Sequence, residues 1–234
     1  MHPPHKRNII QEFKFPLYAI ELFQQWKQLE QKHPNFEQHP ILVLPGFGAS
    51  DRSTYLLRTF LQKCGLEVYD WQLGFNHGDI RKLIPPLIDR LSDISKHHNC
   101  SVVLIGWSLG GIIARELSRV SEKDVRAICC LGSPIVGGPI STIYAPLYTY
   151  MGKDLSKIAH IIEKRESMPL QVPSHVIYSK KDGIVHWEAC LDTFNEHTTY
   201  TEVNTPHFSM GFSVEIYCEL LRWLKTILPN KKQI

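Results

Sequence analysis

The chain has 234 residues, of which 43% are hydrophobic and 21% charged, and its formal net charge is +3. These values are typical of one globular domain with a sizeable core, and they exclude disordered, collagen-like and coiled-coil proteins. The small, dispersed positive charge does not indicate a nucleic-acid partner. We therefore predict one domain over residues 1–234 that binds no nucleic acid.

The N-terminal sequence and the cysteines indicate the cellular compartment of the protein. The opening sequence, MHPPHKRNIIQEF, has neither the uninterrupted apolar core nor the cleavage site of a signal peptide. No window reaches the ~18 apolar residues of a membrane span. The six cysteines form no C-x-x-C pair and are interpreted as reduced thiols. These features predict a cytoplasmic protein.

Residues 1–35 are predicted to be a helical N-terminal segment. Pro16 suits the first position of a helix, and an apolar stripe at helical spacing follows over residues 17–29. Two interpretations stay open for this stripe. It packs on the core, or it forms an amphipathic surface beside a lipid-facing entrance, which would give the protein a transient contact with a lipid surface.

From residue 41 onward, strands and helices alternate. The predicted strands are short apolar runs, most of them continuous rather than alternating, as in sheets that are covered on both faces. They span residues 41–45, 67–73, 101–106, 125–132, 174–179 and 199–204. Helices are predicted over residues 53–65, 80–98, 109–121 and 213–228, with a boundary or kink at Pro85–Pro86.

This order predicts an α/β protein with a minimal, mostly parallel sheet of about six strands flanked by helices. Ligands of such sheets bind beyond the carboxyl ends of the strands. Residues 134–172 interrupt the alternation with an apolar aromatic half and an amphipathic half. We interpret this stretch as a short lid or cap insertion, the alternative being an irregular surface excursion.

The sequence LIGWSLGG places Ser108 between a predicted strand and a predicted helix. The G-x-S-x-G pattern alone is short enough to occur by chance, but its position gives it weight. A sharp turn at this point strains the backbone of the serine, so its neighbours must be small, and Gly106 and Gly110 meet that need. Ser108 is therefore the candidate nucleophile.

A serine hydroxyl needs a base, and the base needs an orienting carboxylate. On such a sheet both follow the nucleophile in the order acid, then histidine. Asp182 comes three residues after the fifth predicted strand, and His207 comes just after the sixth. We predict Asp182 as the acid and His207 as the base. The rival acid Asp192 is predicted to lie on a helix.

Ester cleavage also needs backbone N–H groups that stabilise negative charge on the carbonyl oxygen. One is expected from Leu109, which follows the nucleophile. The other is expected from Phe47, in the glycine-rich loop PGFGAS after the first strand. The alternative for this loop is a simple turn that ends the strand.

Together, LPGFGAS, LIGWSLGG, YSKKDGIVHW and PHFSMGF resemble the α/β-hydrolase superfamily, and its lipase and esterase branch in particular. The resemblance runs from about residue 40 to residue 228. It implies the α/β-hydrolase fold, with a Ser108–Asp182–His207 triad and an oxyanion hole formed by Phe47 and Leu109. The chain departs from the pattern at its start, where the first two strands are not evident, and in the loop after residue 45, where His-Gly-Gly-Gly is absent.

The predicted activity is hydrolysis of carboxylic esters through an acyl-enzyme, without a metal or an organic cofactor. Apolar side chains near the nucleophile and in residues 134–172 favour a lipid or medium-chain acyl group over a sugar or a charged substrate. An acyltransferase or thioesterase on the same triad, and a non-catalytic acyl-binding module, remain alternatives. The predicted pocket residues are Trp107, Tyr144, Leu147 and Tyr148.

Overall fold

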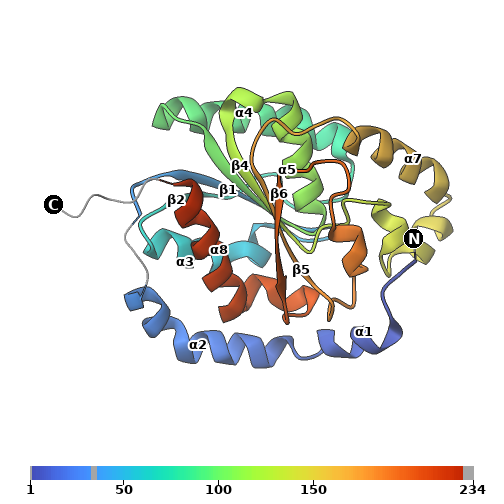
Figure 1. The fold of residues 1–234 in the computed structure, drawn as a ribbon, viewed down its shortest axis with the longest axis horizontal. Helices are drawn as coiled ribbons and strands as arrows, with labels where there is room; N and C mark the ends of the chain where they lie inside the picture. Colours follow the sequence, from blue (N-terminus) through green and yellow to red (C-terminus); the bar gives the residue numbers. More distant parts are fainter. Residues whose placement is uncertain (1, 33–35, 229–234) are drawn as a thin grey trace.

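The computed structural model describes residues 2–32 and 36–228, and its centre is a sheet of six parallel strands (Figure 1). The strand order is β2-β1-β3-β4-β5-β6. The strands are β1 (Pro40–Leu44), β2 (Glu67–Tyr69), β3 (Val102–Trp107), β4 (Val125–Leu131), β5 (Ser174–Ser179) and β6 (Thr198–Val203). This is the predicted α/β architecture with six strands.

Helices cover both faces of the sheet because its central strands are apolar on both sides. Ile41 and Val43 of β1 pack in the cluster that includes α3 (Tyr55–Lys63) and α8 (Val214–Ile227). Leu42 and Leu44, which alternate with them, pack in the cluster that includes α4 (Ile80–His98) and α5 (Leu109–Val120). The continuous apolar run of the strand is thus divided between two core layers.

Shorter elements lie in the connections. They are η1 (Asp51–Thr54), η2 (Glu122–Asp124), η3 (Gly138–Ser141), α6 (Ala145–Tyr150), α7 (Leu155–Glu166), η4 (Trp187–Cys190) and η5 (His207–Phe212). The predicted insertion, residues 134–172, contains η3, α6 and α7.

The strand order determines where a ligand can bind. After β1 the chain moves outward to β2, and from β3 onward it moves the other way across the sheet. The crevice between β1 and β3, at the carboxyl ends of the strands, is the point at which a parallel sheet of this kind holds its ligand. The loops after β1 and β3 carry Phe47 and Ser108.

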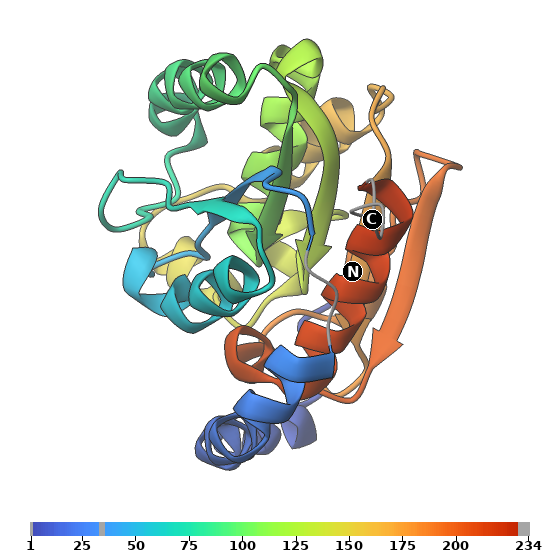
Figure 2. The same ribbon diagram turned by 90° about the vertical axis from the view of Figure 1, so that its left-hand side faces the viewer.

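The N-terminal segment forms α1 (Lys6–Glu12) and α2 (Phe15–Lys32), which lie end to end beyond the carboxyl ends of β5 and β6 (Figures 1 and 2). They pack against η5, and α2 also packs against α8. No helix in the described part of the chain combines the length and the apolar character that a membrane crossing needs.

Three local predictions were wrong. Strand β2 ends at Tyr69 because the N–H groups of Trp71 and Gln72 donate to the Asp51 carboxylate instead of extending a ladder. Helix α4 has no boundary at Pro85–Pro86 but runs through both residues, while the alternative of a kink stays a prediction. Asp192 is not on a helix but in an irregular segment, where its carboxylate accepts the N–H groups of Phe194 and Asn195.

Candidate active site

Ser108 sits on a strained turn between β3 and α5. Its φ of 55° and ψ of −120° are sparsely populated by any residue with a side chain. The turn brings backbones into contact on both sides. A β-carbon on Gly106 would lie 2.3 Å from the Gly110 carbonyl carbon, and one on Gly110 would lie 2.2 Å from Leu44 O. Both glycines are therefore required by close packing, in line with the sequence prediction.

The loop after β1 lies directly beside the serine. A β-carbon on Gly46 would be 3.2 Å from Ser108 Cβ and 3.9 Å from its Oγ. Among the described residues, the backbone N–H groups of Phe47 and Leu109 donate no hydrogen bond to the protein. These two N–H groups are thus unpaired beside a hydroxyl, as the oxyanion-hole prediction requires.

Asn76 holds that loop in place. Its side chain is fully buried; Nδ2 donates to Pro45 O over 2.9 Å, and Oδ1 accepts the Gly78 N–H. Its backbone makes two further bonds, from Gly48 N–H to Asn76 O and from Asn76 N–H to Ala49 O, each 2.8 Å long. Sequence reasoning missed Asn76, because an asparagine in a loop carries no signal that distinguishes a buried brace from a turn residue.

The structure joins Asp182 and His207. Asp182 Oδ2 lies 2.7 Å from His207 Nδ1, and both side chains are buried. The other carboxylate oxygen, Oδ1, accepts the N–H groups of Ile184 and Val185. An ionised carboxylate only accepts hydrogen bonds, so it selects the tautomer with the proton on Nδ1 and leaves Nε2 as an acceptor.

Two contacts place Ser108 alongside this pair. The Ser108 N–H donates to Leu131 O over 2.7 Å. Gly132, which follows Leu131, lies against the Asp182–His207 pair. A β-carbon on Gly132 would be 2.9 Å from His207 Nδ1 and 3.1 Å from Asp182 Oδ2. The Ser108 hydroxyl itself makes no hydrogen bond to any described residue, His207 included. In enzymes without bound substrate, the hydrogen bond between a catalytic serine and its histidine is often long, and it commonly shortens only when substrate binds.

The surroundings of His207 favour its charged form. Burial lowers the pKa of the imidazole, but the Asp182 charge, the hydrogen bond to Asp182 and the charge of Glu12 together raise it above its ordinary value. Glu12 is a buried carboxylate from the end of α1 and was not singled out in the sequence.

Aromatic side chains surround the loop after β1. The Phe47 ring contacts Tyr144 and Tyr148, with ring centroids 5.8 and 6.0 Å apart. Leu147, between the two tyrosines, is exposed. The Trp107 ring packs on His207 and on Phe212 and is only 8% exposed, so it supports the imidazole from within the core.

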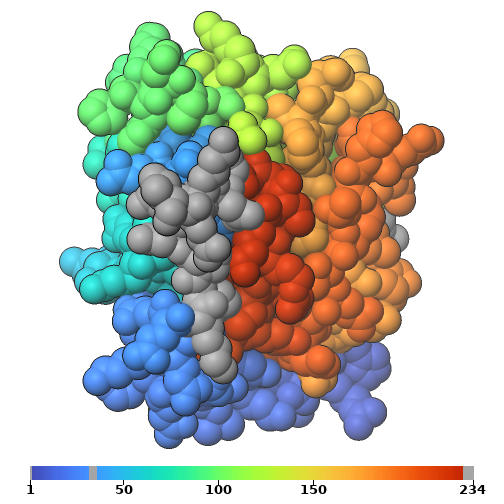
Figure 3. Space-filling view, turned by 60° about the vertical axis from the view of Figure 1, so that its left-hand side comes forward, coloured from blue at the N-terminus to red at the C-terminus, as the bar shows by residue number. Residues whose placement is uncertain are grey.

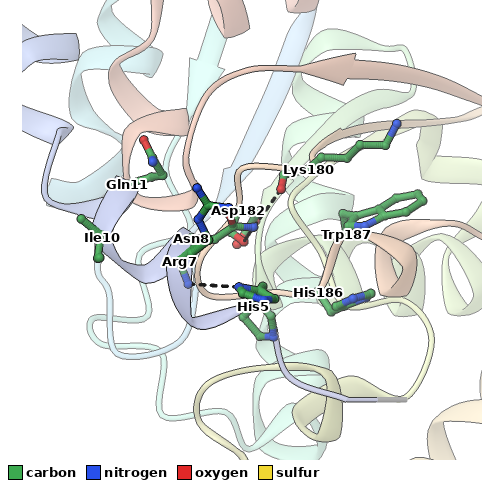
Figure 4. Close-up of a pocket in the computed structure, with 10 residues that line it drawn as sticks. His5, Arg7, Asn8, Ile10, Gln11, Lys180, Asp182, His186 and Trp187 are labelled. Carbon is green, nitrogen blue, oxygen red and sulfur yellow. Dashed lines mark hydrogen bonds between the residues drawn. The ribbon is translucent and has the colours of Figure 1, made fainter.

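A hollow of about 570 Å³ lies between α1 and the loop that carries Asp182 (Figure 4). Polar and charged side chains predominate in its lining, among them His5, Arg7, Lys180 and His186. Neither Ser108 nor His207 lines this hollow.

Comparisons with known proteins agree with this geometry. The sequence model of the Alpha/beta hydrolase family matches residues 35–220. A search of curated protein sequences found no match. The fold is similar to a lipase-esterase related protein from Clostridium acetobutylicum ATCC 824, with 14% identity, a TM-score of 0.61, and coverage of 84% of this chain and 97% of that chain.

Two further solved structures share the fold. A soluble variant of monoglyceride lipase from Saccharomyces cerevisiae has 13% identity and a TM-score of 0.59, with 85% of this chain and 91% of that chain covered. A structure described as an aryl esterase from Burkholderia cenocepacia has 13% identity and a TM-score of 0.60, with 83% and 93% covered. The family model spans most of the sequence, and the chain belongs to the alpha/beta hydrolase family.

Proposed function

We propose that the protein hydrolyses carboxylic esters through a Ser108–His207–Asp182 triad. The observation that carries this proposal is the 2.7 Å bond between Asp182 and His207 beside a serine held at a φ of 55°. A strained serine next to a buried, oriented imidazole combines a nucleophile with its base.

The reaction follows from this arrangement. His207 Nε2 takes the hydroxyl proton while Ser108 Oγ attacks the ester carbonyl carbon, and the N–H groups of Phe47 and Leu109 bind the resulting oxyanion. The imidazolium then gives its proton to the leaving alcohol, and the acyl group stays on Ser108. Water, activated by the same imidazole, releases the acid. Asp182 orients the ring and stabilises its cation.

The substrate class follows from the aromatic surface beside the serine. Phe47 contacts both Tyr144 and Tyr148, and burial raises the pKa of both tyrosines, which keeps their hydroxyls neutral. Such a surface favours an apolar acyl chain. We infer a lipid-type or medium-chain ester as substrate.

Two experiments test this proposal. A fluorophosphonate probe should label the folded wild-type protein but not Ser108→Ala, and Ser108→Ala should retain the wild-type fold. A panel of p-nitrophenyl esters should show turnover that rises from short to medium acyl chains and disappears in Ser108→Ala. A folded wild-type protein that reacts with neither reagent would show that the site binds without catalysis.

The acyl acceptor needs its own measurement, because an acyltransferase would use the same triad. Products from a p-nitrophenyl ester should be free acid even when an alcohol acceptor is added. If transfer of the acyl group to the added alcohol is faster than hydrolysis, the protein is an acyltransferase and the hydrolase proposal is wrong. Faster turnover of the matching thioester would make the enzyme a thioesterase.

A further inference from the structure

The inner side of α1 places a buried carboxylate between the two loops that carry Asp182 and His207. Glu12 Oε1 accepts the N–H groups of Gly183, over 2.7 Å, and of His207, over 3.0 Å. Oε2 accepts the N–H of Phe208 over 2.7 Å. One side chain, only 4% exposed, thus bridges the residue after Asp182 and the backbone of His207 itself.

The neighbouring turn of α1 reinforces this contact. Asn8 Nδ2 donates to Lys180 O and to Asp182 O, so α1 lies directly on the loop after β5 (Figure 4). A β-carbon on Gly183 would lie 2.5 Å from Asn8 O, which shows how closely the helix and the loop approach. The position of the Asp182 loop is therefore coupled to the N-terminal helix.

We propose that Glu12 is a positioning residue, which holds the Asp182 and His207 loops at the separation that their hydrogen bond needs. The proposal rests on the proposed ester hydrolysis. A carboxylate suits this role because two oxygens can accept three N–H groups at once, whereas an amide presents one oxygen and one donor group. Glu12 makes no contact with the reacting atoms and acts through the backbone of His207.

Charge gives Glu12 a second effect. The ionisable groups that act on His207 are Asp182 and Glu12. Asp182 and His207 act in turn on Glu12, which itself faces Tyr18 and Tyr144. The Glu12 charge raises the pKa of His207, so its removal should lower that pKa. A purely structural anchor would not change the titration of the base.

The test compares Glu12→Gln with Glu21→Gln, a matched change at an exposed position of α2. With active enzyme counted by fluorophosphonate labelling, Glu12→Gln should lower kcat roughly tenfold to 100-fold with little change in KM. It should also move the acid limb of the pH profile to lower pH. Glu21→Gln should behave as wild type.

Several outcomes would overturn the proposal. Wild-type kcat and an unmoved acid limb in Glu12→Gln, even with lower thermal stability, would reduce Glu12 to an anchor of α1. If Glu12→Gln does not fold, Glu12→Asp provides the test instead. The shorter side chain keeps the charge but moves the carboxylate oxygens away from the three N–H groups that they accept. A wild-type kcat in Glu12→Asp would refute the positioning role. If the fluorophosphonate probe does not label the wild-type protein, the esterase proposal is refuted instead. NMR titration of His207 in the wild type and in Glu12→Gln then tests the effect of Glu12 on the His207 pKa independently.

Helices α1 and α2 lie along one rim of the molecule (Figures 1 and 3), and they carry a separate feature, an exposed apolar stripe. Phe13, in the turn between α1 and α2, is 77% exposed, and Phe23, within α2, is 85% exposed. Exposed apolar side chains grouped in this way mark an interaction surface. The stripe consists of Ile10, Phe13, Leu17, Ile20 and Phe23.

The charges around the stripe indicate its partner. Among residues 6–31, the exposed cations are Lys6, Arg7, Lys14 and Lys27, and the exposed acid is Glu21. An apolar stripe flanked by cations fits a lipid surface that carries anionic headgroups. Helices α1 and α2 also lie beyond the carboxyl ends of β5 and β6 (Figure 2), and Ser108 and His207 follow strands at this same edge of the sheet.

We infer that α1 and α2 dock the protein on an anionic lipid surface with the catalytic edge toward it. Sedimentation with phosphatidylcholine vesicles that contain phosphatidylserine should remove Ser108→Ala protein from solution, and pure phosphatidylcholine vesicles should remove less. Adding Phe13→Ser and Phe23→Ser should weaken binding at least about tenfold. Val120→Ser, at an exposed apolar residue at the end of α5 remote from Ser108, should leave binding unchanged.

Two results would overturn the lipid proposal. Equal vesicle binding by the stripe variant and the parent protein, or none by either, would exclude the stripe as a lipid contact. A lipid-free dimer that dissociates in the stripe variant would identify a second copy of the chain as the partner. Neither result depends on ester hydrolysis, since the vesicle experiment uses Ser108→Ala throughout.

Discussion

Gly132 and His207 lie so close together that a β-carbon on Gly132 would stand 2.9 Å from His207 Nδ1. The glycine follows β4, and its φ of 54° is itself unfavourable for a residue with a side chain. A residue outside every recognisable motif thereby sets the space in which the Asp182–His207 bond forms.

Gly132→Ala should reduce kcat by on the order of 100-fold, because the added methyl group displaces the imidazole from Asp182. The backbone strain at a positive φ contributes about 1–2 kcal/mol of lost stability as well. Gly152→Ala, at a φ of 70° with nothing within 4 Å of the added carbon, isolates the strain. Steady-state kinetics and thermal unfolding of both variants check this, and equal activity of the two would contradict it.

The pH dependence follows from the raised pKa of His207. Burial lowers this pKa, but Asp182 and Glu12 together raise it by more, so it lies above 6.5. Only the neutral ring accepts the Ser108 proton, so kcat/KM should fall as pH drops through a value above 6.5. Protonated His207 also stabilises the fold below 6.5, and this contribution is lost as pH rises through the folded-state pKa. Activity and this part of the stability thus change in opposite directions.

A pH profile of kcat/KM with a p-nitrophenyl ester checks this prediction. Asp182→Asn should move the acid limb to lower pH and reduce kcat by on the order of 10⁴-fold, because both the charge and the tautomer control are lost. An acid limb below 6.5 in the wild-type protein would show that Asp182 does not stabilise the imidazolium.

Asn76→Ala should loosen the loop that carries Phe47. The substitution leaves the buried Pro45 carbonyl without its donor, at a cost of about 1–3 kcal/mol. If the Phe47 N–H then leaves the oxyanion position, kcat falls by roughly 10²-fold. Asn204→Ala, at an exposed position, is the control. Unfolding in urea and ester kinetics provide the two readouts, and unchanged kcat in a destabilised variant would separate the loop from catalysis.

The fold could be predicted, and three candidate catalytic residues could be placed, because both depend on local pattern. The central strands appear as continuous apolar runs, and Ser108 directly follows one of them, β3. Asp182 and His207 come a few residues after β5 and β6. Glu12 and Asn76 could not be predicted, because their roles depend on contacts with distant segments. Glu12 lies 195 positions from His207 in the sequence, and nothing in IIQEF marks its glutamate as buried.

The prolines of α4 show a different limit of sequence reasoning. Pro85 and Pro86 are exposed on the outer side of the helix, and so are Arg81 and Lys82, whose carbonyls lose their helical donors. Water can satisfy those carbonyls, while Leu87 and Leu91 on the inner side bury completely. Core packing on the buried side thus outweighs a break that local rules place at the prolines.

A buried ion cluster connects α5 to the insertion and should dominate the stability of this region. Arg115 is fully buried and lies 2.6 Å from Glu166, at the end of α7, and 2.7 Å from Asp192. Burial lowers the pKa of Arg115, but the charges and hydrogen bonds of its neighbours, Glu166 foremost, together raise it above its ordinary value, so the guanidinium stays charged. Arg115→Met leaves two buried carboxylates with only Arg119 to pair with Glu166. We expect a loss of about 3–5 kcal/mol in the free energy of unfolding.

The matched control is Arg222→Met, which removes an exposed arginine paired with Glu219 on α8. Such a pair contributes about 0–1 kcal/mol, so this variant should unfold close to wild type in urea. Limited proteolysis adds a local readout, because release of Glu166 should expose α7 and the chain around it to cleavage before the sheet unfolds. Equal unfolding midpoints for the two variants would show that the buried cluster contributes no more than a surface pair, and that the insertion is held by its apolar contacts instead.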